Sequence, residues 1–193
     1  MPSPKILIIP GSTRTGSLNV RLAALAAKEL TLIDVEARRV SLEDYPLPLY
    51  DADVEANSGA HPNAIKLKQM IAAHHGVFIA SPEYNGSVPP ALKNAIDWVS
   101  QVRERNEPGY AAFRDRVFAL GAASTEMHGG MRGLMALRQI LELGCGAMVL
   151  PEQIAIPQAD QAFDERDNLI QPGLANQLRA QLARLVEVSR MMM

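Results

Sequence analysis

The chain has a single cysteine, Cys145, among its 193 residues, so no disulfide can form within it. A lone thiol is typical of a reducing compartment, and we expect a cytoplasmic location. The first apolar run is only as long as a strand, and it lacks the longer core and cleavage site of a signal peptide. No apolar stretch is long enough to cross a bilayer, so we expect no membrane partner.

An excess of charge of one sign is also missing. The chain has 19 basic and 21 acidic residues, which gives a formal net charge of −2. Nucleic acid is therefore a poor candidate partner, because a phosphate backbone demands a basic stripe. Hydrophobic residues make up 48% and charged residues 21%, as in ordinary globular proteins. The length suits one α/β domain over residues 1–193.

Short apolar runs alternate with longer amphipathic stretches along the sequence. The runs predict strands at 5–10, 34–40, 76–82, 116–124 and 147–156, the last one broken by Pro151. Helical spacing predicts helices around 18–26, 67–74, 92–99, 134–144 and 174–185. The polar connection 41–63, with three prolines, is expected to be a surface loop. Strands alternating with helices predict a doubly wound α/β fold, with a parallel sheet covered on both faces.

The three segments richest in glycine and polar side chains each follow a predicted strand directly. They are "GSTRTGSLN" (11–19), "SPEYNGSVPP" (81–90) and "ASTEMHGGMRG" (123–133). Ligands of doubly wound sheets bind at the carboxyl ends of the strands, where such loops meet. We therefore expect one site formed by all three.

The first of these segments is typical of a phosphate-binding loop. Gly11 and Gly16 have Walker spacing, but Ser17 and Leu18 follow where a triphosphate site needs lysine and then serine or threonine. The dinucleotide pattern G-x-G-x-x-G is absent too. Hydroxyls, Arg14 and a helix N-terminus suit one compact phosphate. A solvated turn with a capping serine remains the alternative.

The second segment adds an aromatic residue and a flexible glycine at another strand end. Pro82 stiffens the exit from the strand, and Gly86 permits a positive φ and a close approach of the backbone to a ligand. Fixed N–H and C=O groups beside Tyr84 suit a flat heteroaromatic ring with polar edges. A purely structural turn is the alternative interpretation.

Three stretches resemble the NAD(P)H-dependent FMN reductase family, the flavodoxin-like group that includes quinone, azo-dye and chromate reductases. They are "GSTRTGSLN", "PEYNGSVPPALKNAIDW" and "HGGMRGLMALRQIL", which lie in the same order between Gly11 and Leu141. The resemblance implies a flavodoxin-like fold with five parallel strands in the order 2-1-3-4-5. It also implies a non-covalently bound FMN and a homodimer or homotetramer.

The family pattern also implies roles for individual residues of this chain. The FMN phosphate is assigned to Ser12, Arg14, Ser17, Leu18 and Asn19. The isoalloxazine is flanked by Pro82, Glu83, Tyr84, Asn85 and Gly86, and its other polar edge by the loop from Ser124 to Gly130, with His128 and Gly129. Hydride transfer needs no side-chain acid or base, so Tyr84 and Asn85 are assigned the shaping of the stacking site. The stretch "STEMHGG" departs from the more glycine- and proline-rich sequence of many relatives.

These features together predict an oxidoreductase that passes hydride from NAD(P)H through FMN to small acceptors. The acceptors expected are quinones, azo compounds, chromate or free flavin, reduced by a ping-pong mechanism. A flavodoxin-type electron carrier and a flavin-binding regulatory protein are the alternatives. Carriers of that type tend to be strongly acidic, whereas this chain carries only −2.

Other residues whose side chains could bind a metal or react are assigned structural roles. Asp51, Asp53 and Glu55 lie in a segment without a calcium-loop glycine, so we expect solvated charges and no metal site. His74 and His75 suit the end of a helix, where imidazole can interact with the last carbonyls. Cys145 is expected to be a small core residue.

Overall fold

The computed structural model describes residues 3–104 and 106–193. Five parallel strands form one sheet in the order β2-β1-β3-β4-β5, which confirms the predicted flavodoxin-like topology. The strands are β1 (Lys5–Pro10), β2 (Glu36–Arg39), β3 (Gly76–Ala80), β4 (Val117–Ala123) and β5 (Met148–Ile156). The central strands are apolar runs, because a parallel sheet is buried on both faces.

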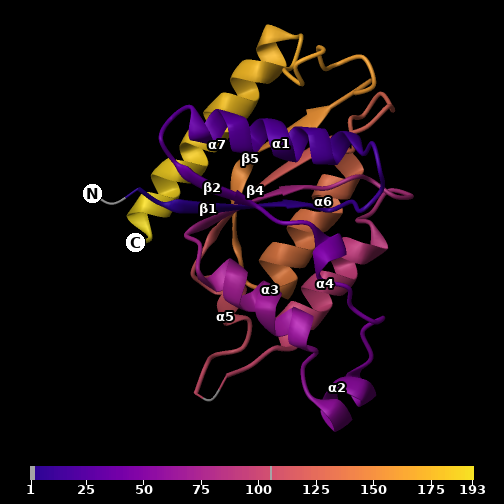
Figure 1. Cartoon of the computed structure of the whole chain (residues 1–193), viewed down its shortest axis with the longest axis vertical. Helices are drawn as coiled ribbons and strands as arrows, with labels where there is room; N and C mark the ends of the chain where they lie inside the picture. Colours follow the sequence, from indigo (N-terminus) through magenta and orange to yellow (C-terminus); the bar gives the residue numbers. More distant parts are fainter. Residues whose placement is uncertain (1–2, 105) are drawn as a thin grey trace.

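Helices cover both faces of this sheet (Figure 1). One face is covered by α1 (Leu18–Thr31) and α7 (Pro172–Met191). The other carries α3 (Pro62–Ala72), α4 (Pro90–Gln101), α5 (Ala111–Arg114) and α6 (Met131–Gln139), which continues as a π-helical turn, η2 (Ile140–Gly144). Alternate residues of β1 divide between the two cores, since Ile6 and Ile8 face α1 whereas Leu7 and Ile9 face the opposite layer.

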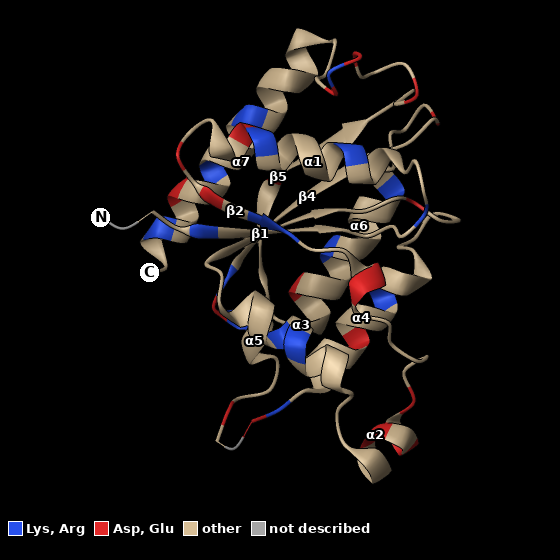
Figure 2. Cartoon of the chain, viewed as in Figure 1, with Lys and Arg blue, Asp and Glu red and all other residues tan. Residues whose placement is uncertain are grey.

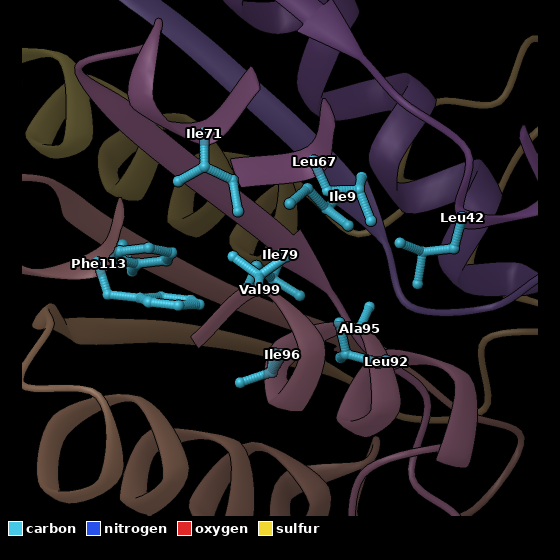
Figure 3. A pocket seen from close by; sticks show the side chains of 11 residues that line it. Ile9, Leu42, Leu67, Ile71, Ile79, Leu92, Ala95, Ile96, Val99 and Phe113 are labelled. Carbon is cyan, nitrogen blue, oxygen red and sulfur yellow. The ribbon is translucent and has the colours of Figure 1, made fainter. Parts of the chain in front are cut away.

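A small cavity of about 30 Å³ lies within the core between the sheet, α3, α4 and α5. Its lining is entirely apolar, and Figure 3 shows Ile79, Val99 and Phe113 from different elements around it. It offers no polar group to a ligand, and an apolar void of this kind stays dry. This cavity is therefore a packing feature and not a binding site.

The segment 41–63 is more ordered than a simple surface loop. It contains a 3₁₀ turn, η1 (Leu42–Asp44), and a short helix, α2 (Ala52–Ser58), so the expectation of a plain loop was wrong. Two side chains of α4 hold it. Trp98 Nε1 donates to Pro48 O at 2.8 Å, while Asn94 donates to the same oxygen and accepts from Tyr50 N at 2.8 Å. These bonds fix a segment whose own sequence lacks helical periodicity.

Pro151 does not end β5, because the strand runs on to Ile156. Its register with β4 shifts between Phe118 and Leu120, and edge strands tolerate proline at such bulges. Helices on both faces pair the carbonyls around the bulge: Arg138 of α6 donates to Leu150 O at 2.6 Å and Gln181 of α7 to Glu152 O at 3.0 Å. The predicted break is thus a bulge within one strand.

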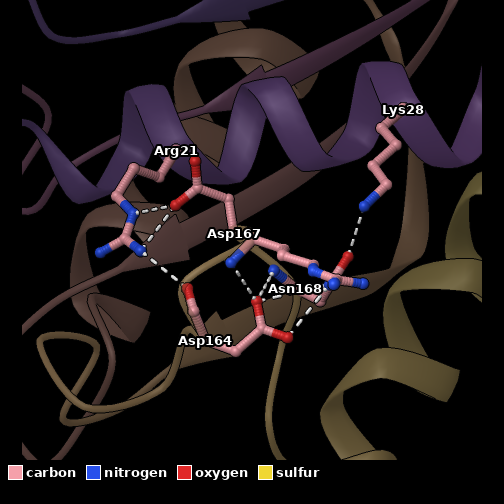
Figure 4. Close-up of polar contacts among 6 residues, drawn as sticks. Arg21, Lys28, Asp164, Asp167 and Asn168 are labelled. Atoms are coloured by element: carbon pink, nitrogen blue, oxygen red, sulfur yellow. Dashed lines mark hydrogen bonds and ion pairs between the residues drawn. The ribbon is translucent and has the colours of Figure 1, made fainter.

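The connection between β5 and α7 is held against α1 by polar contacts (Figure 4). Arg21 Nε donates to Asp167 at 2.8 Å, and Lys28 Nζ donates to Asn168 Oδ1 at 2.6 Å. The Asp164 carboxylate accepts from Arg166 N and Asn168 N. Hydrogen bonds from Asn168 lower the pKa of Asp164 from its ordinary value. The same connection also contacts the third loop, because Ala159 N donates to Ser124 O at 2.9 Å.

Candidate functional site

A cavity of about 200 Å³ lies at the carboxyl ends of β1, β3 and β4. The structure thus brings the three polar loops together, as the sequence predicts. The cavity is lined by Ser12, Arg14, Ser17, Leu18, Asn19, Pro82, Glu83, Tyr84, Ala123, Ser124 and Thr125. The predicted residues outside this lining are Asn85, Gly86, His128 and Gly129. Thr125 belongs to the loop from Ser124 to Gly130 that the family pattern assigns to the ring, whereas Ala123 was not singled out.

The first loop presents hydroxyls and backbone N–H groups beside a guanidinium. Ser17 caps α1, and its Oγ accepts from Asn19 N at 3.3 Å, while Ser12 Oγ accepts from Arg14 N at 3.2 Å. In the part of the chain described, the backbone N–H groups without a protein partner include those of Thr13, Thr15, Gly16 and Leu18. Unpaired N–H groups at a helix N-terminus attract anions.

Asn19 connects the start of α1 to the end of β4. Its Nδ2 donates to Ala123 O at 2.8 Å and its Oδ1 accepts from Ala123 N at 2.9 Å. The side chain is 2% exposed, so both bonds are shielded from water. Asn19 therefore fixes the first loop against the third, in addition to lining the cavity.

The second loop contains a tight two-residue hairpin turn at Asn85 and Gly86. Tyr84 N donates to Ser87 O at 2.9 Å, and Ser87 N donates to Tyr84 O at 3.0 Å. Both turn residues have positive φ, 51° and 77°, as a type I′ turn requires. The positive φ predicted for Gly86 is confirmed. Asn85 and Gly86 form the turn, and Tyr84, 45% exposed, lies at the edge of the cavity.

Glu83 joins the second loop to the third. Its Oε2 accepts from the backbone N–H groups of Arg132 and Gly133 at 3.1 and 3.2 Å, and its Oε1 lies 2.5 Å from Arg132 Nη2. These N–H groups belong to the first turn of α6, whose N-cap is Gly130 and which has no side-chain cap of its own. A carboxylate from another loop thus caps the helix and meets its positive end.

We expect replacement of Glu83 by alanine to loosen the start of α6. The free energy of unfolding should fall by about 1–2 kcal/mol, because a helix loses its capping group. Hydrogen exchange should accelerate at the amides of Arg132 and Gly133. A matched control is Asp51→Ala, which removes the side-chain cap of the exposed helix α2. Unchanged exchange at Arg132 and Gly133 in the Glu83 variant would contradict this role.

Glycine is required where the third loop crosses the end of β5. Gly129 has a φ of +60°, and a Cβ there would lie 2.8 Å from backbone atoms of Ile156 and Pro157. Ser124 N donates to Ile156 O at 3.1 Å, and its Oγ accepts from Glu126 N at 3.2 Å. His128, which directly precedes Gly129, is exposed. Gly129 thus lets the loop lie close to β5 beside the cavity.

The residues expected to be structural are found in structural settings. Burial raises the pKa of the Cys145 thiol to about 11 and lowers that of His74, whose Nδ1 lies 2.6 Å from Met70 O. His75 Nδ1 accepts from Lys5 N at 2.9 Å. Among the described residues, no group of histidine, cysteine and carboxylate side chains is arranged to hold a metal. None of the described helices has the length and apolar character of a membrane span.

Comparison with known proteins agrees with the arrangement of the three loops. The model of the family described as NADPH-dependent FMN reductase matches residues 4–161. A probable NADPH:quinone oxidoreductase of Oryza sativa is 35% identical over 95% of this chain and 89% of its own. The quinone reductase of Escherichia coli K12 is 33% identical over 92% and 91% of the two chains.

A likeness among solved structures supports the same fold. FerB, an NAD(P)H:(acceptor) oxidoreductase from Paracoccus denitrificans, superposes with a TM-score of 0.81 at 23% identity and covers 98% of both chains. The family model spans most of the domain, including all three loops of the cavity. The chain therefore belongs to the NADPH-dependent FMN reductase family, whose activity depends on FMN and NAD(P)H.

Proposed function

We propose that the cavity binds FMN and that the enzyme reduces quinones at the expense of NAD(P)H. The observation that carries this proposal is the convergence of the three strand-end loops on one cavity, with Arg14 and unpaired backbone N–H groups on its first loop. Those orphan donors fit a phosphate, and the relatives named quinone reductases favour quinones as acceptors. Azo compounds, chromate and free flavin remain candidate acceptors from the sequence.

In this proposal the first loop holds the phosphate. The hydroxyls of Ser12 and Ser17 already accept hydrogen bonds from the backbone, so each keeps its own proton to donate to an anion. Arg14 adds a charged donor and, among the residues described, takes part in no ion pair. Leu18 supplies a backbone N–H, and Asn19 keeps this loop in register with β4.

The second and third loops hold the ring system. Pro82, Glu83 and Tyr84 line one side of the cavity, where Tyr84 and the turn at Asn85 and Gly86 shape the stacking surface. Ser124 and Thr125 line the other side, and the Thr125 N–H has no protein partner within the described residues. That N–H, with His128 and Gly129 nearby in the chain, is suited to the polar edge of the ring.

Bound FMN supplies the hydride chemistry between the reduced nicotinamide and the acceptor. The chain's own contribution is binding and orientation, so we assign no proton transfer to a side chain. Tyr84 and Asn85 act here by contact with the stacked rings. We also propose that the protein works in the cytoplasm as a homodimer or homotetramer; exposed Met135 and Leu143 are apolar side chains that a subunit could cover.

We expect the purified protein to be yellow and to release FMN on heating. Steady oxidation of NADPH or NADH should follow addition of a benzoquinone. Chromatography of the released flavin and absorbance of the reduced nicotinamide measure the two properties. Release of FAD, or a colourless protein that ignores added FMN, would refute the proposed cofactor. Flavin binding without quinone turnover would instead favour the electron carrier.

Turnover should be ping-pong. The three loops form one cavity, so the nicotinamide and the quinone must stack on the same open face and cannot occupy it together. Initial rates over a grid of both substrates should give parallel double-reciprocal lines, with each substrate inhibiting competitively at high concentration. Intersecting lines, together with a ternary complex, would require a second binding site for one substrate.

A further inference from the structure

Another cavity, of about 260 Å³, lies beside the loop that follows β1. It shares only Ser12 and Arg14 with the FMN cavity proposed above. The remaining lining comes from the rest of that loop, from the start of α1 and from the end of β2 and the turn after it: Pro10, Thr13, Thr15, Gly16, Val20, Arg39, Val40, Ser41 and Glu43. Arg14 thus borders two cavities at once.

The cavity collects positive charge from two elements distant in sequence. Arg39 is the last residue of β2 and pairs in register with Ile8 of β1, which places it close to the loop that carries Arg14. Figure 2 shows basic residues both along the carboxyl-terminal part of β2 and in the loop after β1. Among the described residues, neither guanidinium has an ion-pair partner within 4.0 Å. The carboxylate of Glu43 is the one acidic group in the lining, so one positive charge is left over.

The donors around this surplus charge suit a phosphate monoester. Guanidinium groups recognise phosphate through paired, charge-assisted hydrogen bonds. The hydroxyls of Thr13, Thr15 and Ser41 add neutral donors, while the unpaired backbone N–H groups of this loop are left to the FMN phosphate. Glu43 can accept from sugar hydroxyls. A ligand that combines a phosphate with a ribose matches the whole set.

We propose that this cavity binds the 2′-phosphate of NADPH and gives the enzyme a preference for NADPH over NADH. The inference rests on the proposed function, because it assigns one end of the dinucleotide whose nicotinamide reaches the flavin. NADH has a hydroxyl in place of that phosphate, so it gains nothing from Arg39. Arg14 contributes to both cavities, whereas Arg39 contributes only to this one.

The discriminating variant is Arg39→Gln, and Arg38→Gln is its matched control. Both arginines are exposed residues of β2 and both changes remove one positive charge. Successive side chains of a strand point to opposite faces, and Arg38 does not line the cavity. A general effect of net charge would therefore appear in both variants, while a local contact with phosphate would appear only in Arg39→Gln.

In FMN-loaded Arg39→Gln we expect the KM for NADPH and the Kd for NADP⁺ by calorimetry to rise about tenfold, the worth of a charged hydrogen-bonding group. The KM for NADH, the Kd for NAD⁺ and the affinity for FMN should stay within about twofold of those of the wild type. All of these quantities should stay within the same range in Arg38→Gln. Inorganic phosphate at constant ionic strength should compete with NADPH in the wild type and less so in Arg39→Gln.

The outcomes separate this inference from the proposed function. A wild-type protein without FMN, or one that oxidises neither NADPH nor NADH with a quinone, would refute the proposed function itself. With that activity intact, an unchanged ratio of the KM for NADPH to the KM for NADH in Arg39→Gln would overturn the inference alone. Phosphate competition lost in Arg39→Gln without any change in NADP⁺ affinity would mean that the cavity binds free phosphate, which would overturn it as well.

Discussion

Replacement of Asn19 by alanine is expected to lower the free energy of unfolding by about 2–4 kcal/mol, because two buried backbone groups lose their partners. The N–H and C=O of Ala123 both pair with the Asn19 amide, and neither residue is more than 3% exposed. The affinity for FMN should fall too, since the first and third loops are no longer held together. Urea unfolding and a titration with FMN measure the two effects.

Asn94→Ala is the matched control for this variant. Asn94 also uses both ends of its amide, toward Pro48 O and Tyr50 N, but it lies on α4 outside the FMN cavity and is only half-buried. The Asn94→Ala replacement should lower the free energy of unfolding by about 1 kcal/mol and leave the affinity for FMN unchanged. Equal stability losses, or an Asn19 variant with normal FMN binding, would show that the tie to Ala123 does not organise the site.

Gly129→Ala is the second substitution with a large expected effect, a loss of about 2–4 kcal/mol together with weaker FMN binding. Its added Cβ would lie 2.8 Å from backbone atoms of Ile156 and Pro157, and the φ of +60° disfavours any side chain. The end of β5 cannot yield without breaking its pairing with β4. The third loop must therefore move away from the sheet, which hydrogen exchange at Ser124 and Gly129 would detect.

Gly86→Ala separates steric conflict from backbone strain. Gly86 has a similar φ of +77°, but its Cβ would meet no protein atom within 4 Å in the described structure. Only the cost of a left-handed conformation applies, about 1–2 kcal/mol. If the two variants lost the same stability, the close approach of Gly129 to β5 would carry no energetic weight.

The sheet could be predicted from the sequence because each strand is marked by its own short apolar run. The apolar run at 76–80 and the alternation of short runs with amphipathic stretches indicate parallel strands without knowledge of any long-range contact. The loops of the site followed from the same logic, since each begins where a strand ends. The hairpin signal "NG" at Asn85 and Gly86 also lies in the sequence, although we interpreted Gly86 partly as a site of ligand approach.

The contacts that organise the site could not be predicted in this way. Asn19 is 104 residues from its partner Ala123, and Glu83 is 49 residues from Arg132, so no periodicity relates them. The order in segment 41–63 likewise comes from Trp98 and Asn94 on α4. Each of these depends on which polar side chain the finished fold brings to an unpaired backbone group.

The contact between Trp98 and the 41–63 segment gives the protein an internal optical probe. Trp98 is the one tryptophan of the chain, is 1% exposed, donates to Pro48 O, and meets Tyr50 edge-on with ring centroids 5.2 Å apart. Its indole emission therefore depends on whether this segment is seated on α4. A red shift that precedes the loss of circular dichroism on heating would report local detachment, and no label would be needed to follow it.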